Sequence, residues 1–417
     1  MAREGATAQA AKAPFRDVFA VTEFRALWIA QLLSVVGDQL ARVALTVLVY
    51  DRTRSALLAS ITFVVSIVPT FFGGVTLAWL ADRYPRRRVM IACDIARCAL
   101  VLVMTLPGLS PASLVVLLFV VTLVGAPFTA ARAASYPDVL TGDRYVMGTA
   151  VTLTTYQFAQ VLGFAAGGTV VAFFGTRTSL VIDAATFAGS AIIVRAWVRP
   201  RAAPAKAGRG RDQSRLAGLV AGARLVLARP GLRWPLLFGL LAAFYDAPEG
   251  MAAPLAHDVG GGAAAVGVIL AADALGQCCG AIVLRRFAAP PTRLRAMGPL
   301  AVAACGMLVL FFAQPGLTAS LLILVASGLC ASYQLAANAA FVQAAPREQR
   351  SQAFGLAQGA LSLGQGTAMI LAGAAAQQHA PARVIAVFGA VGTVVAMAIA
   401  TGWAHDRGRP ASGRQQR

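Results

Sequence analysis

Two acids that could carry protons, Asp246 and Glu249, lie three residues apart within an apolar segment. Residues at this spacing share one face of a helix, so the two carboxyl groups are expected to be neighbours. Two carboxylates close together in a low-dielectric medium favour protonation of one of them. The pair therefore predicts a proton-coupling site, with Asp273 as a third candidate. The alternative is that Pro248 breaks the helix, and that the acids face water or cap the broken segment.

A second group of charges lies earlier in the chain, also within apolar segments. Asp38 and Arg42 are four residues apart, one helical turn, where they can pair and lower the cost of burial. Each charge inside a membrane costs about 2.5 to 3.5 kcal/mol, which makes such residues functional candidates. Asp38 and Arg42 are predicted to line a central cavity, and the alternative is a static ion pair. Asp94 and Arg97 are predicted to form a structural pair.

A basic loop between two apolar stretches has the sequence Leu80-Ala81-Asp82-Arg83-Tyr84-Pro85-Arg86-Arg87-Arg88. A carboxylate such as Asp82 can accept hydrogen bonds from the free amides at the start of a neighbouring helix. That contact would hold two parts of the molecule together. Asp138 is the predicted partner of Arg86 or Arg87. The alternative is that the arginines only fix the orientation of the loop at a membrane surface.

The segments that carry these residues are apolar enough to lie in a bilayer. Of the 417 residues, 58% are hydrophobic and 13% are charged, and the mean hydropathy is +0.70. Soluble domains average about 25% charged residues. Windows of roughly 20 apolar residues predict twelve membrane-spanning helices. Their predicted starts are Phe24, Ala56, Val89, Ser113, Tyr145, Leu180, Trp234, Ala263, Leu294, Leu317, Gln352 and Val384.

The net charge of +19 is spread over alternate loops, so it predicts membrane orientation. With both ends on one side, that side holds the stretches 83–88, 195–233 and 285–295 and both tails, whereas the other side holds only Arg52, Arg54, Arg177 and Arg383. Basic loops stay in the cytoplasm, so both termini are predicted to be cytoplasmic. A nucleic-acid surface would gather these charges on one face with aromatic residues, so no nucleic-acid partner is expected.

A Pro, Gly, Ala and Arg-rich stretch divides the predicted spans into two sets of six. We expect an all-α membrane protein with two pseudo-symmetric six-helix bundles. The predicted parts are a cytoplasmic tail (1–23), a first bundle (24–198), a basic linker with an amphipathic surface helix (199–231), a second bundle (232–404) and a cytoplasmic tail (405–417).

The basic loop resembles the G-x-L-A-D-R-x-G-R-R loop of major facilitator superfamily transporters. The matching residues are Asp82, Arg83, Arg86 and Arg87, and Ala78 and Pro85 replace the two glycines. The resemblance implies the major facilitator fold. It also implies that the four matching residues belong to a charge network that closes the cytoplasmic side.

Further matches are similar to the enterobactin-exporter and macrolide-efflux branch of this superfamily. They are Phe24-Arg25-Ala26-Leu27-Trp28-Ile29-Ala30-Gln31, Gly37-Asp38, the loop through Met90 with Asp94 and Arg97, and Ile182-Asp183-Ala184. In addition, Gly163, Gly167 and Gly168 resemble the G-P-x-x-G-G element of antiporter branches, with Phe164 in place of proline. The alternative for these glycines is close helix packing.

The resemblance implies proton-driven export of an amphipathic small molecule such as a drug, macrolide or siderophore. The expected setting is a monomer in the plasma membrane that contacts lipid, needs no cofactor and no metal, and uses the proton gradient. No nucleotide-binding motif of the type G-x-x-x-x-G-K-[ST] occurs. An importer or lysolipid flippase of the same fold stays open, and so does a non-transporting sensor or scaffold. Three scattered histidines disfavour a membrane enzyme.

Overall fold

The computed structural model describes residues 15–77, 79–201, 224, 226, 228–346 and 349–408. The elements identified in these ranges are α-helices and one 3-10 helix. Most of the predicted linker with its amphipathic helix lies outside the described residues. The same holds for Ala78 of the basic loop, for most of the predicted N-terminal tail and for the last part of the C-terminal tail.

The first half of the chain begins with the short helix α1 (Phe15–Phe19). The elements that follow are α2 (Thr22–Thr53), α3 (Ala56–Val65), α4 (Val68–Thr76), α5 (Trp79–Arg83), α6 (Arg86–Met104), α7 (Pro111–Val139) and α8 (Asp143–Trp197). Helix α8 contains two consecutive helices that join at Gly175, where φ is 77° and ψ is 169°. A positive φ of this size favours glycine, so this residue permits the turn between two predicted spans.

The second half has more interruptions. Its elements are α10 (Pro230–Leu240), α11 (Ala242–Tyr245), α12 (Ala247–Gly250), α13 (Ala252–Asp258), α14 (Ala263–Phe287), α15 (Pro290–Met307), η1 (Leu308–Ala313), α16 (Leu317–Ala331), α17 (Gln334–Ala344), α18 (Arg350–Ala375) and α19 (Pro381–Gly408). The segment that holds Asp246 and Glu249 is broken into short helices, with Asp246 between α11 and α12 and Pro248 as the second residue of α12. Because proline has no amide hydrogen, Pro248 accounts for the break at Asp246.

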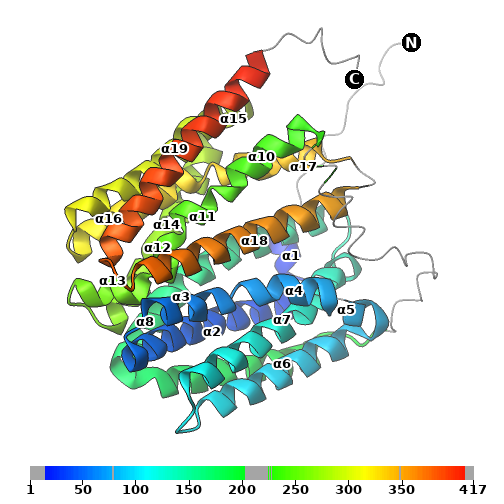
Figure 1. The fold of residues 1–417 in the computed structure, drawn as a ribbon. Helices are drawn as coiled ribbons and strands as arrows, with labels where there is room; N and C mark the ends of the chain where they lie inside the picture. Colours follow the sequence, from blue (N-terminus) through cyan, green and yellow to red (C-terminus); the bar gives the residue numbers. More distant parts are fainter. Residues whose placement is uncertain are drawn as a thin grey trace, which may run out of the picture.

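Eight described segments are long and apolar enough to cross a membrane. One of them is α8, which covers the predicted starts at Tyr145 and Leu180. Helices α6 and α18 and the broken segment from α10 to α13 run alongside these spans (Figure 1). The fold is therefore a multi-pass helical bundle, and the exact number of twelve crossings stays a prediction.

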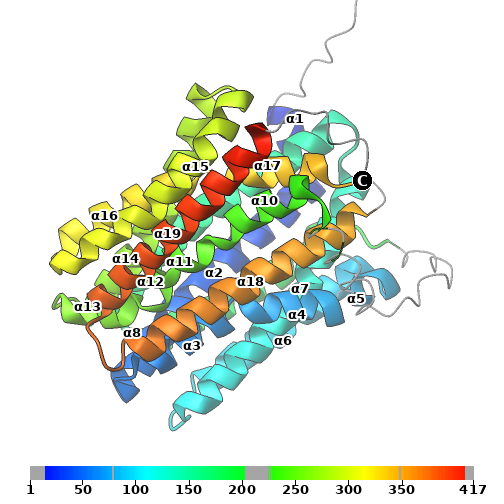
Figure 2. The same cartoon turned by 45° about the horizontal axis from the view of Figure 1, so that its top comes forward.

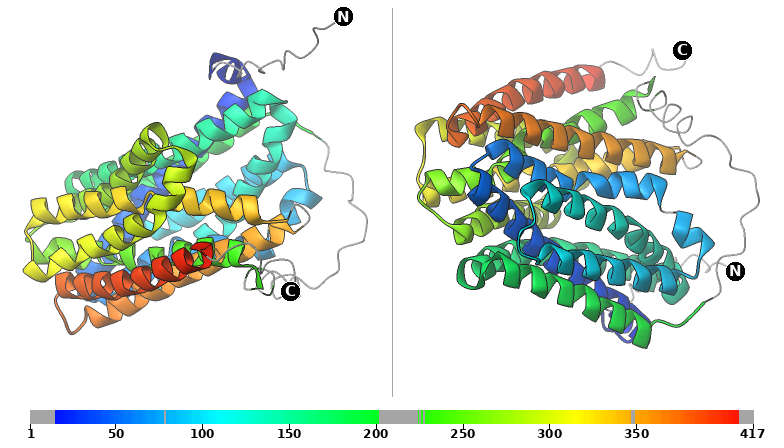
Figure 3. Two further views of the ribbon diagram at one scale, coloured as in Figure 1. Left: turned by 90° about the horizontal axis from the view of Figure 1, so that it is seen from above. Right: turned by 60° about the horizontal axis from the view of Figure 1, so that its bottom comes forward.

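The two halves form two groups of helices that lie side by side. In Figure 1 the blue to teal helices of the first half lie on one side, and the bright green to red helices of the second half lie on the other; the right view of Figure 3 also shows this division. Helix α18 runs along α3 and α4 (Figure 2), and α14 packs against α8. Both contact regions join the first half to the second.

The halves approach most closely at small residues. A Cβ added to Gly168 of α8 would lie 2.6 Å from Cα of Gly267 in α14, so the two backbones touch where a larger residue could not fit. In the other contact region, the Ser60 hydroxyl donates a hydrogen bond of 2.8 Å to the carbonyl of Gly250. These contacts join the halves at the end of the bundle away from the basic loop.

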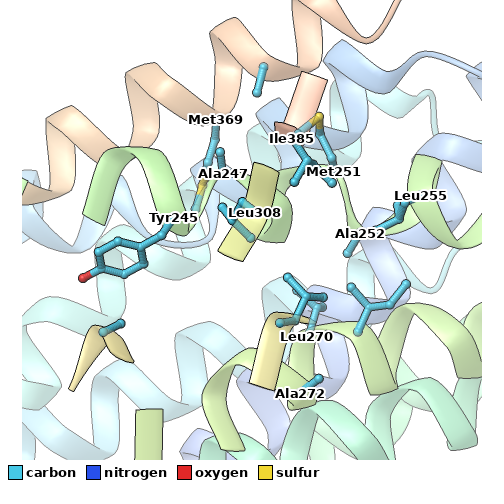
Figure 4. Close-up of a cluster of buried hydrophobic side chains, with 14 of the residues drawn as sticks. Tyr245, Ala247, Met251, Ala252, Leu255, Leu270, Ala272, Leu308, Met369 and Ile385 are labelled. Atoms are coloured by element: carbon cyan, nitrogen blue, oxygen red, sulfur yellow. The ribbon is translucent and has the colours of Figure 1, made fainter. Parts of the chain in front are cut away.

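The largest apolar core surrounds the broken segment of the second half. Met251 and Ala252 of this segment belong to one buried cluster with Leu308, Met369 and Ile385, which come from η1, α18 and α19 (Figure 4). Short helices with few internal hydrogen bonds gain their stability mostly from such packing. The cluster thereby fixes the position of the acids at the breaks.

Candidate functional site

Arg97 of α6 is the centre of the buried charges in the first half. Its guanidinium forms an ion pair with Asp38 and donates a hydrogen bond of 3.1 Å to the Ser34 hydroxyl, both on α2. The guanidinium carbon also lies 4.0 Å from the centroid of the Phe187 ring, in the second part of α8. Arg97 is only 4% exposed. One side chain therefore ties three helices together through charge, hydrogen bonding and cation–π contact.

These contacts overturn two predicted pairs. Arg42 does not pair with Asp38, although both are on α2. Its guanidinium donates a hydrogen bond of 3.2 Å to the carbonyl of Ser66. Ser66 lies at the break between α3 and α4, where the helix leaves carbonyl groups free to accept. Asp94 does not pair with Arg97 either, and instead accepts a hydrogen bond of 2.6 Å from the Ser190 hydroxyl.

A cavity of about 320 Å³ lies within the first half, and its lining includes both Asp38 and Arg42. Asp38, whose side chain is 35% exposed, reaches this cavity from its pair with Arg97. Arg132, Tyr156 and Asp183 also contribute to the lining. The structure thus brings the two predicted residues of this half to one cavity, although they do not bind each other.

The acids of the second half have amide partners. Asp246 accepts a hydrogen bond of 2.6 Å from Nε2 of Gln365, and Asp273 accepts one of 2.7 Å from Nε2 of Gln277. Asp246 is 8% exposed and Asp273 is 3% exposed. Among the described residues, no basic side chain forms an ion pair with either acid. Both are buried carboxyl groups without a bound counter-charge.

Glu249 lies near the interface between the halves. Its carboxyl group is within electrostatic range of Asp273 in its own half and of Arg42 in the other half. Asp246 is in turn within range of both other acids. The structure therefore brings the three predicted acids of the second half into one electrostatic group. None of the three acids lines the cavity of the first half.

A larger cavity of about 650 Å³ lies between the halves. It is bordered by the beginning of α8 and by parts of α10, α14, α17 and α18. Its lining includes Arg285, in the basic last turn of α14. Three aromatic side chains line it, those of Phe158, Phe341 and Phe354. A cavity of this size can hold a drug-sized ligand.

The basic loop is only partly arranged as predicted. Arg86 forms the expected ion pair with Asp138, and it also donates a hydrogen bond of 2.7 Å to the carbonyl of Ala134. Arg87 donates to the carbonyl of Arg195. All of these contacts lie within the first half. Arg83 lies over the Trp79 ring, with its guanidinium carbon 5.9 Å from the ring centroid.

Asp82 is exposed, and it forms no hydrogen bond or ion pair in the part of the chain that the structure describes. The predicted contact between Asp82 and a neighbouring helix is therefore not made in this conformation. Its role in closing the basic side stays a prediction.

The glycines of the antiporter-like element all lie at close helix contacts. A Cβ on Gly163 would lie 2.9 Å from Cβ of Gln39, and one on Gly167 would lie 3.3 Å from Cα of Leu40, both on α2. Gly168 instead faces Gly267 in the other half. Packing alone accounts for all three glycines, and an antiporter role stays a prediction.

The amide partners of the acids were not predicted from the sequence. Gln277 follows Asp273 by four residues on one helix, so this contact could have been found from spacing. Gln365 lies 119 residues from Asp246, and no local pattern connects the two. Gln277 and Gln365 could both have been selected as candidates, because polar side chains are uncommon within membrane helices.

Two helical bundles with a cavity between them are the arrangement of many membrane transporters. The chain belongs to the Major Facilitator Superfamily, whose family model matches residues 27–247 and 248–417. The family and the fold are those of transporters, and the chain is a multi-pass membrane protein.

Two curated relatives are both described as the enterobactin exporter EntS. The one from Shigella boydii serotype 4 (strain Sb227) is 27% identical over 269 residues, which is 64% of each chain. The one from Escherichia coli O1:K1 / APEC is 26% identical over the same length. The match thus spans just under two thirds of the length of these relatives.

Solved structures support the fold over nearly the whole chain. A bacterial homologue of the human lysosomal transporter Spinster has a TM-score of 0.71 and 16% identity, covering 96% of this chain and 100% of the other. A POT family transporter in complex with 5-aminolevulinic acid has a TM-score of 0.73 and 13% identity, covering 92% and 96%. At these identities the similarity concerns the fold alone.

Proposed function

We propose that this protein is a proton-coupled exporter of an amphipathic small molecule, of drug, macrolide or siderophore type, that works by alternating access. The direction is supported by the similarity to enterobactin exporters. The two bundles with a cavity between them suit a rocking motion of one half against the other. The protein acts as a monomer in the plasma membrane, and the proton gradient supplies the energy.

Proton coupling is carried by one observation, the burial of Asp246 and Asp273 against amides with no ion-pair partner among the described residues. A carboxylate without a counter-charge is costly in a low-dielectric interior, so the neutral, protonated form is favoured there. When the halves move and water reaches the group, the proton can leave. Glu249, near the interface, joins this group of proton carriers through its interaction with Asp273.

The arrangement of the halves supports a state that opens toward the cytoplasm. The basic loops mark one end of the bundle, which the positive-inside tendency assigns to the cytoplasm. The larger cavity borders the beginning of α8 and the end of α14, at this same end. The glycine contact and the Ser60 hydrogen bond join the halves at the opposite end. A substrate would thus enter the cavity from the cytoplasm.

The test is substrate-induced proton movement in vesicles that contain the purified protein, followed with an enclosed pH-sensitive dye over a panel of amphipathic compounds. Asp246→Asn and Glu249→Gln keep side-chain size but cannot release a proton, so we expect the signal to fall by at least about tenfold in one or both variants. Asp258→Asn is the matched control, because this acid is exposed at the end of the same broken segment. Unchanged proton movement in both variants would remove these acids as carriers.

A further inference from the structure

Among the described residues, the larger cavity is lined by five carboxamide side chains and by no carboxylate. The amides are Gln157, Gln277, Gln334, Asn338 and Gln358, contributed by α8, α14, α17 and α18. Arg285, an exposed residue in the last turn of α14, is the charged residue of the lining in the part of the chain that the structure describes. A cation in this cavity would meet a guanidinium and no opposite charge, whereas an uncharged ligand would meet many hydrogen-bonding groups.

Two of the five amides are fixed by contacts to the protein. Gln277 donates from Nε2 to Asp273, and Gln334 donates from Nε2 to the carbonyl of Gly239 at 3.0 Å and to the hydroxyl of Tyr245 at 2.7 Å. Their Oε1 atoms form no hydrogen bond with described residues. Since the nitrogens are engaged, each fixed amide offers an acceptor oxygen to a ligand that carries O–H or N–H groups.

The other three amides are free to adapt. Gln157, Asn338 and Gln358 are exposed, and their side chains form no hydrogen bonds within the described ranges. Each can donate and accept. Gln157 belongs to the first half and the other two belong to the second, so a ligand held by all three would contact both halves.

The same cavity has an apolar surface beside the amides. Leu153 is 63% exposed and Phe158 is 45% exposed, both on the first part of α8. Exposed apolar side chains in a cavity favour a ligand with an apolar body. The apolar wall and the amides together favour a ligand that has both an apolar surface and a surface of hydrogen-bonding groups.

We propose that this cavity binds an uncharged amphipathic compound that carries several hydroxyl or amide N–H groups, in preference to an amphipathic cation. The proposal names the substrate class for the transport function proposed above and rests on that function. It makes that function more specific, because a cavity lined by amides favours polyhydroxylated or amide-rich compounds, whereas a cavity lined by acids would favour cationic compounds.

The first test uses three dansyl sulfonamides of similar size, measured by fluorescence polarisation with the purified full-length protein. One carries a tris(hydroxymethyl)methyl group, one a butyl group and one a trimethylammonium group. We expect the trihydroxy probe to bind about tenfold more tightly than either of the others, because its hydroxyl groups are satisfied by the amides. Equal or tighter binding of the cation, or no binding of the trihydroxy probe up to about 1 mM, would overturn the proposal.

The second test changes one amide into an acid of the same shape. Gln358→Glu should shift the preference toward the trimethylammonium probe by about tenfold, because it adds a negative charge to the cavity. The matched control is Gln343→Glu, at an exposed position of α17 that does not line the cavity. An equal change in affinity for all three probes, or the same shift in the control, would argue against binding at the amides.

Binding is measured without a proton gradient, so failure of the two proposals can be distinguished. If the trihydroxy probe binds preferentially but moves no protons in vesicles, the proton coupling fails and the ligand class stands. If the cationic probe alone drives proton movement, the ligand class fails and the transport function stands.

Discussion

The two halves of this transporter stabilise their buried acids in different ways. In the first half, Asp38 is bound by the guanidinium of Arg97. In the second half, Asp246 and Asp273 are bound by the amides of Gln365 and Gln277. The first half thus contains a charged pair, and the second contains acids with neutral partners.

The difference concerns how easily each acid can change its protonation state. Protonating Asp38 would leave the guanidinium of Arg97 buried without its charged partner, which is costly. Protonating Asp246 leaves a neutral acid beside a neutral amide, and the amide can still donate to the carboxyl oxygen. The buried pair of the first half is therefore suited to a fixed structural role. The acids of the second half are suited to binding and releasing a proton.

The breaks in the helices reinforce this contrast. In the first half, the break at Ser66 is bound by the guanidinium of Arg42. In the second half, Asp246 itself lies at the break between α11 and α12. In the first half, the free carbonyl at the break is thus hydrogen-bonded by the permanent charge of Arg42. In the second half, the break lies beside the titratable carboxyl group of Asp246.

The largest effect on stability is expected for Arg97→Gln. The change removes the ion pair and leaves Asp38 without a counter-charge, which should lower the free energy of unfolding by about 3 kcal/mol. This is the lower part of the usual range, because the Asp38 side chain is 35% exposed to the smaller cavity. Denaturation with increasing SDS in mixed micelles measures the loss.

Arg88→Gln, an exposed position on the same helix, is the control for the Arg97 change. In the double variant Asp38→Asn/Arg97→Gln both charges are absent, so most of the lost stability should return. A double variant no more stable than Arg97→Gln alone would show that the charge of Asp38 is not the cause.

A smaller effect is expected for Gln365→Leu in the second half. It removes the donor to Asp246, but the acid can become neutral, so the loss should be about 1 to 2 kcal/mol. Gln377→Leu is the matched control, because this exposed amide after α18 donates a hydrogen bond of 3.3 Å to the Ser55 hydroxyl and not to an acid. The same denaturation assay compares both halves directly. A loss as large as that of Arg97→Gln would contradict the proposed difference between them.

The smallest effect on stability is expected for Asp82→Asn. Because Asp82 is exposed and has no partner among the described residues, the free energy of unfolding should change by less than about 0.5 kcal/mol. If Asp82 stabilises the state that is closed on the basic side, the variant should nevertheless populate that state less. Crosslinking of cysteines introduced into α5 and the end of α17 would measure this. Crosslinking equal to that of the parent would remove the predicted role of Asp82.

The fold was largely predictable from the sequence, because membrane spans are set by local hydrophobicity. The predicted starts at Ala56, Ala263 and Leu317 coincide with the first residues of α3, α14 and α16. The Arg86 ion pair with Asp138 could also be anticipated, since the short loops at one end of a bundle lie close together. The number of crossings and the division at 198 and 231 stay predictions.

The partners of the buried charges were harder to predict. Spacing on one helix suggested Asp38 with Arg42 and Asp94 with Arg97, and both suggestions were wrong. Helical spacing shows which side chains can meet, but it cannot show which competing partner from another helix lies closer. Ser66 and Ser190 are such competitors, and they are distant in sequence from the residues that they bind.

The sequence alone determined that this chain is a membrane bundle with acids in its interior, because hydrophobicity and charge are properties of local segments. It also allowed the contact of Asp273 with Gln277, which lie one helical turn apart, although this contact was not predicted. Only the tertiary structure decided that Arg97 binds Asp38, that Gln365 binds Asp246, and that five amides meet in one cavity. These contacts join residues far apart in the chain, so they exist only once the helices have packed.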